Sequence, residues 1–489
     1  MHDVLHMTIG STLRSLAASK PDANAIICDG AQITWSQLSA CVQRLARELC
    51  RCTPPGAGVA IHLPNSPHFL AVFLAVAMTG RQAQVLDIDW PASHLKAALK
   101  GLSPDLFVCE GTDFSYQCLF IDIDEPLAHI CPGEIFEPDS PDALAPFYVG
   151  FTSGSTGIPK GYRRNHLSWV ASFAADAHEF GIGSDDIVVA PGSMSHSLFL
   201  YAAIHALQVG ASVILFRRFR PDIVMAEIRD RGASVLYAAP TQLALLLDVP
   251  GPPIPTVRTI LISGSKWSSA ISEKTPGRFP NADFAEFYGA SELSFVTVRK
   301  IAEKCPEASV GRAFHGVSIK IRDAGGDELP IGDTGRIFVS SPFLFADYAI
   351  GYGDLVRRND ELCIGDIGYL DRDGFLYLQG RENRMIVTSG KNVFPEQIER
   401  VLNSHQSVKA SAVFGIPDRR RGERLVALVQ VTESLSASEL MRYARRDLSL
   451  PFVPRIYAKP LEWRWTASGK TDFARLKADW LSGACEVLE

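Results

Sequence analysis

The chain has 489 residues, of which 47% are hydrophobic and 21% charged, and its formal net charge at pH 7 is −6. This balance is typical of a globular protein, and the length allows about three lobes at roughly 100–200 residues per domain. The acidic net charge argues against a nucleic-acid-binding protein, for which a basic domain is expected.

Targeting and membrane segments are not indicated. The N-terminus has no basic region followed by an apolar run, and the longest apolar stretch, residues 69–78, is too short to span a bilayer. The ten cysteines show no framework spacing, which suits reduced thiols in the cytosol. We therefore expect a cytoplasmic protein without a membrane span.

The first elements alternate between helix and strand. Apolar residues recur at three- and four-residue intervals over 34–49, which predicts an amphipathic helix. A strand at 58–63, a helix at 67–79, a strand at 84–88 and a helix near 92–102 follow. The series resumes with strands at 187–190, 212–216, 235–238 and 259–262 and a helix at 198–208. This alternation implies parallel βαβ units.

The C-terminal half changes character twice. Residues 310–380 contain short strands broken by glycine-containing turns, which predicts a β-rich lobe. After Arg381 we expect a smaller α+β segment, with helices at 395–404 and 436–448 and strands at 408–414 and 425–432. The chain as a whole is therefore predicted to be α/β.

The most informative segment is 151–161, Phe-Thr-Ser-Gly-Ser-Thr-Gly-Ile-Pro-Lys-Gly. Its glycines let backbone N–H groups approach a phosphate closely, its hydroxyl groups donate further hydrogen bonds, and Lys160 adds a positive charge. The apolar residues 147–151 are typical of a buried strand that leads into a loop. The alternative is a flexible Gly/Ser surface loop.

Two better-known catalytic motifs are excluded by spacing. A Walker loop requires Gly-Lys-Ser/Thr, but Lys160 lies between Pro159 and Gly161. The nearest match to a Gly-x-Ser-x-Gly nucleophile elbow is Gly289-Ala-Ser-Glu-Leu293, which lacks the last glycine. The sequence thus indicates neither a P-loop NTPase nor a serine hydrolase.

Segment 151–161 resembles, at all eleven positions, the phosphate loop of the adenylate-forming superfamily, which includes acyl-CoA synthetases, peptide-synthetase adenylation domains and luciferases. The resemblance extends from about residue 8 to residue 480. It implies a large N-terminal domain of packed βαβ lobes plus a β-rich lobe, residues 1–381, and a small mobile α+β C-terminal lid, residues 382–489. It gives Thr152 a catalytic role and assigns ATP binding to Thr152, Ser153, Gly154, Ser155, Thr156, Gly157 and Lys160.

A second candidate site is residues 286–292, Glu-Phe-Tyr-Gly-Ala-Ser-Glu. Tyr288 could stack on a base, Ser291 could bind a phosphate and Glu292 could hold Mg²⁺, although a strand-end turn with a solvated glutamate is the alternative. Beside the loop, the segment resembles the family's Tyr-Gly-x-Thr/Ser-Glu motif. The resemblance makes Glu292 catalytic and metal-binding and assigns nucleotide contacts to Glu286, Phe287, Tyr288, Gly289, Ala290 and Ser291.

Two segments near residue 380 resemble the family's ribose and hinge motifs. Cys363-Ile-Gly-Asp366 keeps the glycine and aspartate of Thr-Gly-Asp, so Asp366 is predicted to accept the ribose hydroxyls, with a turn aspartate as the alternative. Arg381 matches an arginine that contacts ribose and phosphate. Asn383 occupies the hinge position, which is commonly Asp or Lys, and lid rotation would pivot there.

Two residues of the predicted lid carry the remaining assignments. Gly390 matches a glycine that lines the pantetheine tunnel, and Lys470, in Thr466-Ala-Ser-Gly-Lys470, matches the lysine that contacts the carboxylate and the α-phosphate during adenylation. Taken alone, Lys470 reads as a solvated lysine. The basic triplet 419–421 could bind the 3′-phosphate of coenzyme A or could be a solvated face.

The acyl pocket is expected to be mainly apolar. His196 matches a pocket histidine and is predicted to be catalytic, although a lone histidine is more often structural. Residues 197–201 lack the aspartate that pairs with an α-ammonium group, which disfavours amino-acid activation. Lys266 is either a solvated neighbour of Trp267 or a partner for a second substrate carboxylate. The pocket candidates are His196, Leu198, Phe199, Tyr201, Ala239, Pro240, Gly264, Trp267 and Ala290, and Gly264 is also expected to contact the nucleotide.

The sequence therefore predicts an ATP-dependent carboxylic-acid:CoA ligase that uses ATP, Mg²⁺ and coenzyme A to form acyl-AMP and then acyl-CoA from a fatty or other apolar acid. Segments 261–267 and 287–295 look most like those of bacterial fatty-acid and o-succinylbenzoate CoA ligases. One alternative is an acyl-AMP ligase that loads a carrier protein, and another is a catalytically silent nucleotide-binding homologue. We expect no nucleic-acid partner and a monomer or homodimer.

Overall fold

The computed structural model describes residues 7–110, 117–122, 127, 136, 138–152, 160–263, 269–301, 303–465 and 471–489. Contacts divide the chain into two compact units, Met1–Ile319 with Val339–Gly353, and Lys320–Phe338 with Asp354–Glu489. Both units combine helices and strands, so the predicted α/β class is confirmed. The predicted domain boundary after residue 381 stays a prediction. Among the described helices, none is both long enough and apolar enough to cross a membrane.

The first unit contains a nine-stranded sheet whose centre is parallel. Six neighbouring strands, from β13 to β1, run parallel, while β2, β14 and β15 are antiparallel additions at the edges. Parallel strands need crossover connections, so this order confirms the predicted βαβ units. In sheet order the strands are β15 (Arg312–Ala313), β14 (Ser294–Lys300), β13 (Asp283–Ala290), β12 (Thr259–Ser263), β11 (Val235–Ala238), β9 (Ile187–Ala190), β10 (Ser212–Leu215), β1 (Asn24–Cys28) and β2 (Ala31–Thr34).

A second, seven-stranded sheet carries the predicted phosphate loop. Its strands β7, β4, β3, β5 and β6 are parallel, and β8 and β18 continue it in antiparallel fashion. In sheet order the strands are β18 (Tyr348–Ile350), β8 (Lys160–Asn165), β7 (Pro146–Thr152), β4 (Gln82–Val85), β3 (Gly58–His62), β5 (Leu106–Cys109) and β6 (Cys118–Phe120).

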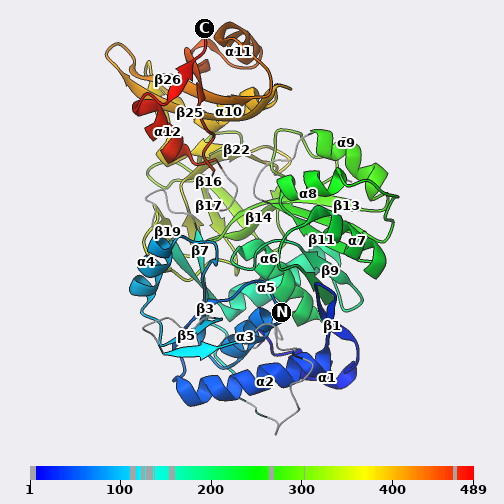
Figure 1. Cartoon of the computed structure of the whole chain (residues 1–489). Helices are drawn as coiled ribbons and strands as arrows, with labels where there is room; N and C mark the ends of the chain where they lie inside the picture. Colours follow the sequence, from blue (N-terminus) through cyan, green and yellow to red (C-terminus); the bar gives the residue numbers. More distant parts are fainter. Residues whose placement is uncertain are drawn as a thin grey trace. The chain divides into compact units, whose positions relative to one another are not determined.

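Three helices lie between these two sheets: α3 (Pro67–Met78), α5 (His166–Phe180) and α6 (Ser197–Val209) (Figure 1). α3 contacts β3, β4 and β7 of one sheet and β1 of the other, so both of its faces are buried. This explains why its sequence is apolar all round rather than amphipathic. Ser66 caps the helix by accepting a hydrogen bond from the Phe69 amide, and Pro67 occupies its first position.

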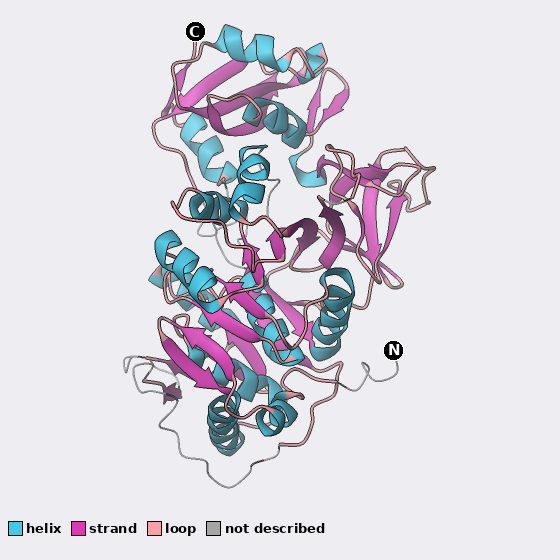
Figure 2. Ribbon diagram, turned by 90° about the vertical axis from the view of Figure 1, so that its right-hand side faces the viewer, coloured by secondary structure: helices cyan, strands magenta, loops and turns pink. Residues whose placement is uncertain are grey.

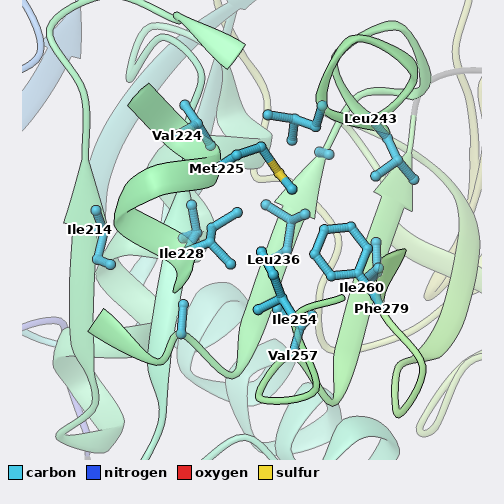
Figure 3. Close-up of a cluster of buried hydrophobic side chains, with 14 of the residues drawn as sticks. Ile214, Val224, Met225, Ile228, Leu236, Leu243, Ile254, Val257, Ile260 and Phe279 are labelled. Atoms are coloured by element: carbon cyan, nitrogen blue, oxygen red, sulfur yellow. The ribbon is translucent and has the colours of Figure 1, made fainter. Parts of the chain in front are cut away.

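Further helices cover the outer faces of the first unit. α7 (Pro221–Arg231), α8 (Pro240–Leu247) and α9 (Ser269–Arg278) pack on the nine-stranded sheet, and Figure 3 shows Val224, Met225 and Ile228 of α7 directed toward Leu236 of β11. The other helices of this unit are α1 (Leu13–Ser19), α2 (Trp35–Cys52) and α4 (Ala92–Leu102). α2 matches the predicted amphipathic helix, and Thr34 with Gln37 forms a capping box at its start.

The second unit contains two six-stranded sheets, whose strands are drawn in magenta in Figure 2. Most of the predicted β-rich lobe corresponds to one sheet with the strands β19 (Val356–Arg358), β20 (Glu361–Cys363), β17 (Gly335–Ser340), β21 (Asp366–Leu370) and β22 (Leu376–Arg381), with β16 (Ser318–Arg322) paired to β17. The prediction was wrong for β15 and β18, which also lie within residues 310–380 but belong to the two sheets of the first unit. The second sheet consists of β24 (Lys391–Val393), β23 (Ile386–Thr388), β26 (Gly422–Val431), β27 (Ile456–Pro460) and β28 (Cys485–Val487), with β25 (Val408–Asp418) paired to β26.

Helices cover both faces of this last sheet. Val413 of β25 packs in a cluster with residues of α10 (Pro395–Asn403) and α11 (Ala437–Ala444), whereas its neighbour Phe414 packs with α12 (Phe473–Leu481). Successive side chains of a strand point to opposite faces, so one strand serves both cores. Two 3₁₀ turns, Glu382–Arg384 and Leu450–Phe452, complete the unit.

Candidate active site

The two ends of the predicted phosphate loop lie next to each other. β7 ends at Thr152, β8 begins at Lys160, and these residues face each other in the antiparallel pair. The loop therefore follows a largely buried strand, as the sequence predicts, and it connects this strand to an antiparallel neighbour. Its interior lies outside the described residues, so the roles of Ser153, Gly154, Ser155, Thr156 and Gly157 stay predictions.

The second predicted segment forms the end of β13 and the turn into β14. Glu286 is buried, and its Oε2 lies 3.7 Å from Nη1 of Arg299 on β14. Gly289 lies at an irregularity of the pairing, and a Cβ atom there would overlap the carbonyl oxygen of Ser294. Glycine is therefore required for this tight approach. The remaining members are Phe287, which is buried, and Tyr288, Ala290 and Ser291, which are half-buried.

Glu292, in this turn, is connected to the loop strands. Its Oε1 accepts a hydrogen bond of 2.7 Å from the Tyr348 hydroxyl, and its carbonyl oxygen accepts one of 2.9 Å from the Phe345 amide. Tyr348 begins β18 and pairs with Tyr162 of β8, two residues beyond Lys160. The structure thus brings Glu292 and the base of the loop into one site of the first unit.

Arg164, for which the sequence left open steering charge for ATP or an ordinary surface position, is a buried residue of this region. It lies on β8 and is only 2% exposed, and it donates hydrogen bonds to the carbonyl oxygens of Ser291 (3.0 Å) and Phe343 (2.5 Å) and to the Ser168 hydroxyl (3.2 Å). Burial lowers the pKa of Arg164 to about 10, so it remains charged at neutral pH. Its sequence position next to Arg163 resembles an ordinary surface pair, which is why composition alone gave no signal of its burial.

Arg163 lies on the opposite face of the same strand, and its environment differs from that of Arg164. Its Nε and Nη2 donate to the two carboxylate oxygens of Asp347 at 2.6 and 3.0 Å, in an exposed ion pair. Exposed pairs of this kind contribute about 0–1 kcal/mol, so Arg163 is a surface residue.

Four of the predicted acyl-pocket residues, His196, Leu198, Phe199 and Tyr201, lie at the start of α6. His196 is the N-cap residue of α6, and the loop before it is held by Asn65, whose amide donates to the Gly192 carbonyl and accepts from the Met194 amide, both at 2.8 Å. Asn65 is a second residue of this region that gave no sequence signal. Tyr162 of β8 is connected to this region through its hydroxyl group. Burial raises the pKa of Tyr162, while hydrogen bonds with Tyr148, Ser197 and Ser291 oppose the rise.

The structure describes some of the pocket candidates and not others. Phe199 and Tyr201 are buried on α6, and Tyr201 packs against Trp169, Phe173 and Phe295 at ring-centroid distances of 5.6, 5.0 and 5.2 Å. Leu198, Ala239 and Ala290 are half-buried and Pro240 is buried. Gly264, Lys266 and Trp267 lie outside the described residues, so their pocket roles stay predictions.

The predicted ribose site lies in the second unit. Asp366 and Arg381 are partners in the β21–β22 pair, and Nε of Arg381 lies 2.9 Å from Oδ1 of Asp366. Asp366 is buried, whereas the Arg381 side chain is 53% exposed. Gly365, at φ +84°, turns the chain into β21. The structure therefore joins two residues that were predicted from separate motifs.

The segment after Arg381 is anchored by a buried ion pair. Arg384 donates to Oε1 of Glu399 at 2.6 Å and to Oε1 of Glu396 at 3.1 Å, and its guanidinium lies 3.7 Å from the ring centroid of Phe473. Oε1 of Glu399 also accepts a 2.7 Å hydrogen bond from the Val413 amide. Asn383, by contrast, is exposed.

The predicted tunnel glycine and adenylation lysine are less fully described. Gly390 has φ +73° and follows Ser389 at φ +53°, so both lie in the left-handed region. Lys470 lies outside the described residues, but the ends of its loop are held together by an antiparallel bridge between Trp465 and Thr471. The catalytic role of Lys470 stays a prediction.

A concave basic site lies beside Gly390 in the second unit. Its walls include three arginines, Arg421, Arg424 and Arg455, and an apolar side formed by Leu450, Pro451 and Val453. Arg424 is paired with Asp418 at 2.6 Å. Of the triplet 419–421, only Arg421 lines this site, so the structure separates its members.

Two family models match the chain. Residues 13–349 match the AMP-binding enzyme model, and residues 397–470 match the model of the AMP-binding enzyme C-terminal domain. The acyl–CoA ligase YhfT of Bacillus subtilis (strain 168), described as uncharacterized, is 36% identical over 483 residues, which are 97% of this chain and 98% of YhfT. The fatty acid–[acyl-carrier-protein] ligase ScoC of Streptomyces coeruleorubidus is 27% identical over 507 residues, which cover 95% and 93% of the two chains.

Solved structures share the fold. The o-succinylbenzoate CoA synthetase MenE of Bacillus subtilis, in complex with the acyl-adenylate OSB-AMP, superimposes with a TM-score of 0.86 at 25% identity over 96% of this chain and 98% of MenE. ATP-bound MatB of Rhodopseudomonas palustris gives a TM-score of 0.86 at 23% identity over 97% and 99% of the two chains.

Proposed function

The chain belongs to the AMP-binding enzyme family, and from this premise we propose that it activates a fatty or other mainly apolar carboxylic acid and transfers it to coenzyme A. It is an AMP-forming acid–CoA ligase that uses ATP and Mg²⁺ and proceeds through an acyl-AMP. The identity of the acid and the roles of the individual residues are proposals.

One observation carries the assignment of the adenylation site. Strand β8, which begins at Lys160, is joined to Glu292 in the β13–β14 turn, because Tyr348 pairs with Tyr162 of β8 and donates to the Glu292 carboxylate. Glycine-rich backbone, hydroxyl groups and a lysine suit a triphosphate, and one acidic side chain suits a metal that arrives with it.

In the first half-reaction, the substrate carboxylate attacks the α-phosphorus of ATP, which forms acyl-AMP and releases pyrophosphate. The loop hydroxyls and Lys160 hold the phosphates, and Lys470 contacts the carboxylate and the α-phosphate as charge develops. Asp366 and Arg381 bind the ribose. Catalysis is therefore mostly positioning and charge neutralisation, and the protein supplies no nucleophile.

Glu292 is the residue that would hold Mg²⁺. The described residues contain no group of three or more potential metal-ligating side chains, and Mg²⁺ commonly uses one or two carboxylates together with substrate phosphates and water. Bound Mg²⁺ would neutralise phosphate charge at this position. The Tyr348 hydroxyl orients the Glu292 carboxylate by donating to Oε1.

An apolar acid is supported by the described pocket candidates. Leu198, Phe199, Ala239 and Ala290 offer little polar surface, and burial of each methylene group is worth about 0.8 kcal/mol. A relative in Staphylococcus aureus (strain MRSA252), provisionally named long chain fatty acid–CoA ligase VraA, is 27% identical over 479 residues. Lys266 would matter only if the acid carries a second carboxylate.

Coenzyme A as the acceptor is supported by the basic site in the second unit. Arg421, Arg424 and Arg455 provide positive charge for the phosphates of its nucleotide, and Leu450 and Pro451 provide apolar contact. A carrier protein remains the second candidate, because the name of ScoC specifies that acceptor. The phosphopantetheine arm of a carrier protein has no 3′-phosphate, so dependence on this phosphate distinguishes the two acceptors.

The deciding experiment has two parts. Pyrophosphate release is first screened over carboxylic acids of increasing chain length, their ω-carboxylated analogues and free α-amino acids, and we expect the apolar acids to be favoured. No release with any acid would indicate the catalytically silent homologue. Coenzyme A, dephospho-coenzyme A and a carrier protein with a free phosphopantetheine thiol are then compared as acceptors in wild type and in Arg421→Gln. Coenzyme A should lose its advantage over dephospho-coenzyme A in the variant, and a wild type that acylates only the carrier would refute the choice of acceptor.

The organisation and location of the enzyme are also proposals. We place the boundary of a C-terminal lid after residue 381, with Asn383 as its hinge. A cytoplasmic location is supported by the described cysteines, which are all free thiols. The monomeric or homodimeric state stays a prediction.

A further inference from the structure

Arg164 is a buried cation at the crossing of three chain segments of the first unit. It extends from β8, which follows the phosphate loop, and donates to the carbonyl oxygens of Ser291 in the β13–β14 turn and of Phe343 in the segment before β18. Its three hydrogen bonds within the described residues all go to neutral oxygen atoms. Burial of a charge is costly, so stability alone would favour an apolar side chain here.

Both carbonyl groups belong to segments that hold Glu292. Ser291 directly precedes Glu292, and Phe343 lies two residues before Phe345, whose amide donates to the Glu292 carbonyl at 2.9 Å. Five residues beyond Phe343, Tyr348 donates to the Glu292 carboxylate at 2.7 Å. The guanidinium therefore fastens the turn and the segment that orients its carboxylate to one strand.

The forked shape of arginine suits this arrangement. Nη1 and Nη2 each donate to a different carbonyl, while Nε donates to Ser168 in the first turn of α5. A lysine has one ammonium group on a flexible stem and cannot span the same acceptors in a fixed geometry. Burial lowers the pKa of Arg164, and the Glu292 carboxylate is among the neighbours that oppose this lowering.

We propose that Arg164 and Tyr348 are positioning residues that fix the Glu292 carboxylate relative to Lys160 and the phosphate loop. This inference rests on the proposed function, because Glu292 is the residue assigned to Mg²⁺. Arg164 fixes the backbone of the turn, and Tyr348 fixes the direction of the carboxylate. Neither residue needs to touch ATP or the acid.

The test compares Arg164→Met, Arg164→Lys and Tyr348→Phe with Arg163→Met. The control removes the neighbouring arginine, whose ion pair with Asp347 lies on the exposed face of the same strand. The first measurement is the affinity for α,β-methylene-ATP, a non-cleavable analogue, with Mg²⁺ and with EDTA. It requires no acid and no turnover.

We expect Mg²⁺ to strengthen analogue binding in wild type and in Arg163→Met. In Tyr348→Phe this enhancement should fall about fivefold, the effect of one hydrogen bond of ordinary strength. In both Arg164 variants it should fall further. Acyl-AMP formation should drop on the order of 10²-fold, as expected for a displacement of about 1 Å, while thioester formation from supplied acyl-AMP should change by less than about threefold.

Several results would overturn the inference. One is a folded Arg164→Met that keeps the wild-type Mg²⁺ enhancement, and another is an equal loss in both half-reactions with unchanged Mg²⁺ dependence. If the Arg164 variants do not fold, Tyr348→Phe decides alone, because it retains the ring packing against Phe345 at 5.0 Å. A wild type without Mg²⁺ enhancement would also refute it. Failure of the proposed function is separate, since that would appear as a wild type that releases no pyrophosphate.

Discussion

Gly289→Ala tests whether the turn geometry, rather than its residue types, creates the adenylation site. A Cβ atom at position 289 would overlap the Ser294 carbonyl oxygen and lie 3.1 Å from its carbonyl carbon, and both atoms belong to rigid backbone. β13 and β14 would therefore have to separate by about 1 Å, and such overpacking typically costs about 1–3 kcal/mol. The displaced turn is the one that carries Glu292.

The effect on activity should exceed the effect on stability. A misplacement of about 1 Å in a positioning group lowers rates on the order of 10²-fold, so acyl-AMP formation should fall by that factor while the protein remains folded. The assay is pyrophosphate release at saturating ATP over a series of Mg²⁺ concentrations, together with a thermal melt. We expect the half-saturating Mg²⁺ concentration to rise.

The matched control is Gly183→Ala. A Cβ atom at position 183 would meet nothing within 4 Å and the residue does not have a positive φ, so activity and melting temperature should stay close to wild type. A Gly289→Ala variant with wild-type rate and wild-type Mg²⁺ dependence would refute the reasoning, because the turn would then tolerate a side chain that the geometry excludes.

Three further predictions concern Glu292, Gly390 and His166. Glu292→Gln should raise the Mg²⁺ concentration required for acyl-AMP formation by about tenfold or more, because an amide lacks the charge that holds a hard cation; unchanged Mg²⁺ dependence would make Glu292 a turn residue. Gly390→Leu should block thioester formation and spare adenylation. Gly390→Ala separates the cost of a side chain at φ +73° from the bulk of leucine, and equal effects of the two variants would contradict the tunnel assignment. Burial lowers the pKa of His166 to about 4 from its ordinary 6.5, so its neutral form contributes stability that is present above pH 6.5 and is lost as the pH falls through about 4. His166→Phe should be less stable than wild type at neutral pH, because it loses the acceptor of the Ile9 amide. Between pH 7 and pH 4, the free energy of unfolding of the variant, measured by urea denaturation, should rise by about 3 kcal/mol relative to that of wild type. Parallel pH dependences of the two unfolding free energies would refute the lowered pKa.

Local patterns determined the elements of this protein. The helix at 34–49, the apolar helix at 67–79 and the strands at 187–190 and 235–238 all occur, at α2, α3, β9 and β11, within a few residues of the predicted bounds. Their signals are short-range, because amphipathic spacing, capping residues and apolar runs act within a few turns of the chain. The alternation of strand and helix likewise implied the parallel sheets, since parallel strands require crossover helices.

The candidate site residues were also recognised from local sequence patterns. Segments 151–161 and 286–292 and the positions Asp366 and Arg381 were found from composition and from resemblance to family motifs. Sequence reasoning treated them as separate motifs, and for the loop interior and for Lys470 the assignments still rest on that reasoning alone.

Tertiary structure decided how those motifs meet. Only the pairing of β18 with β8 brings Tyr348 to Glu292, across 56 residues of chain, and only the register of β21 and β22 puts Arg381 on Asp366. It also separated Arg163 from Arg164, two identical neighbours of which one pairs at the surface and one is buried. Burial and partnership depend on which distant segments pack against a strand, and no property of the adjacent residues contains that information.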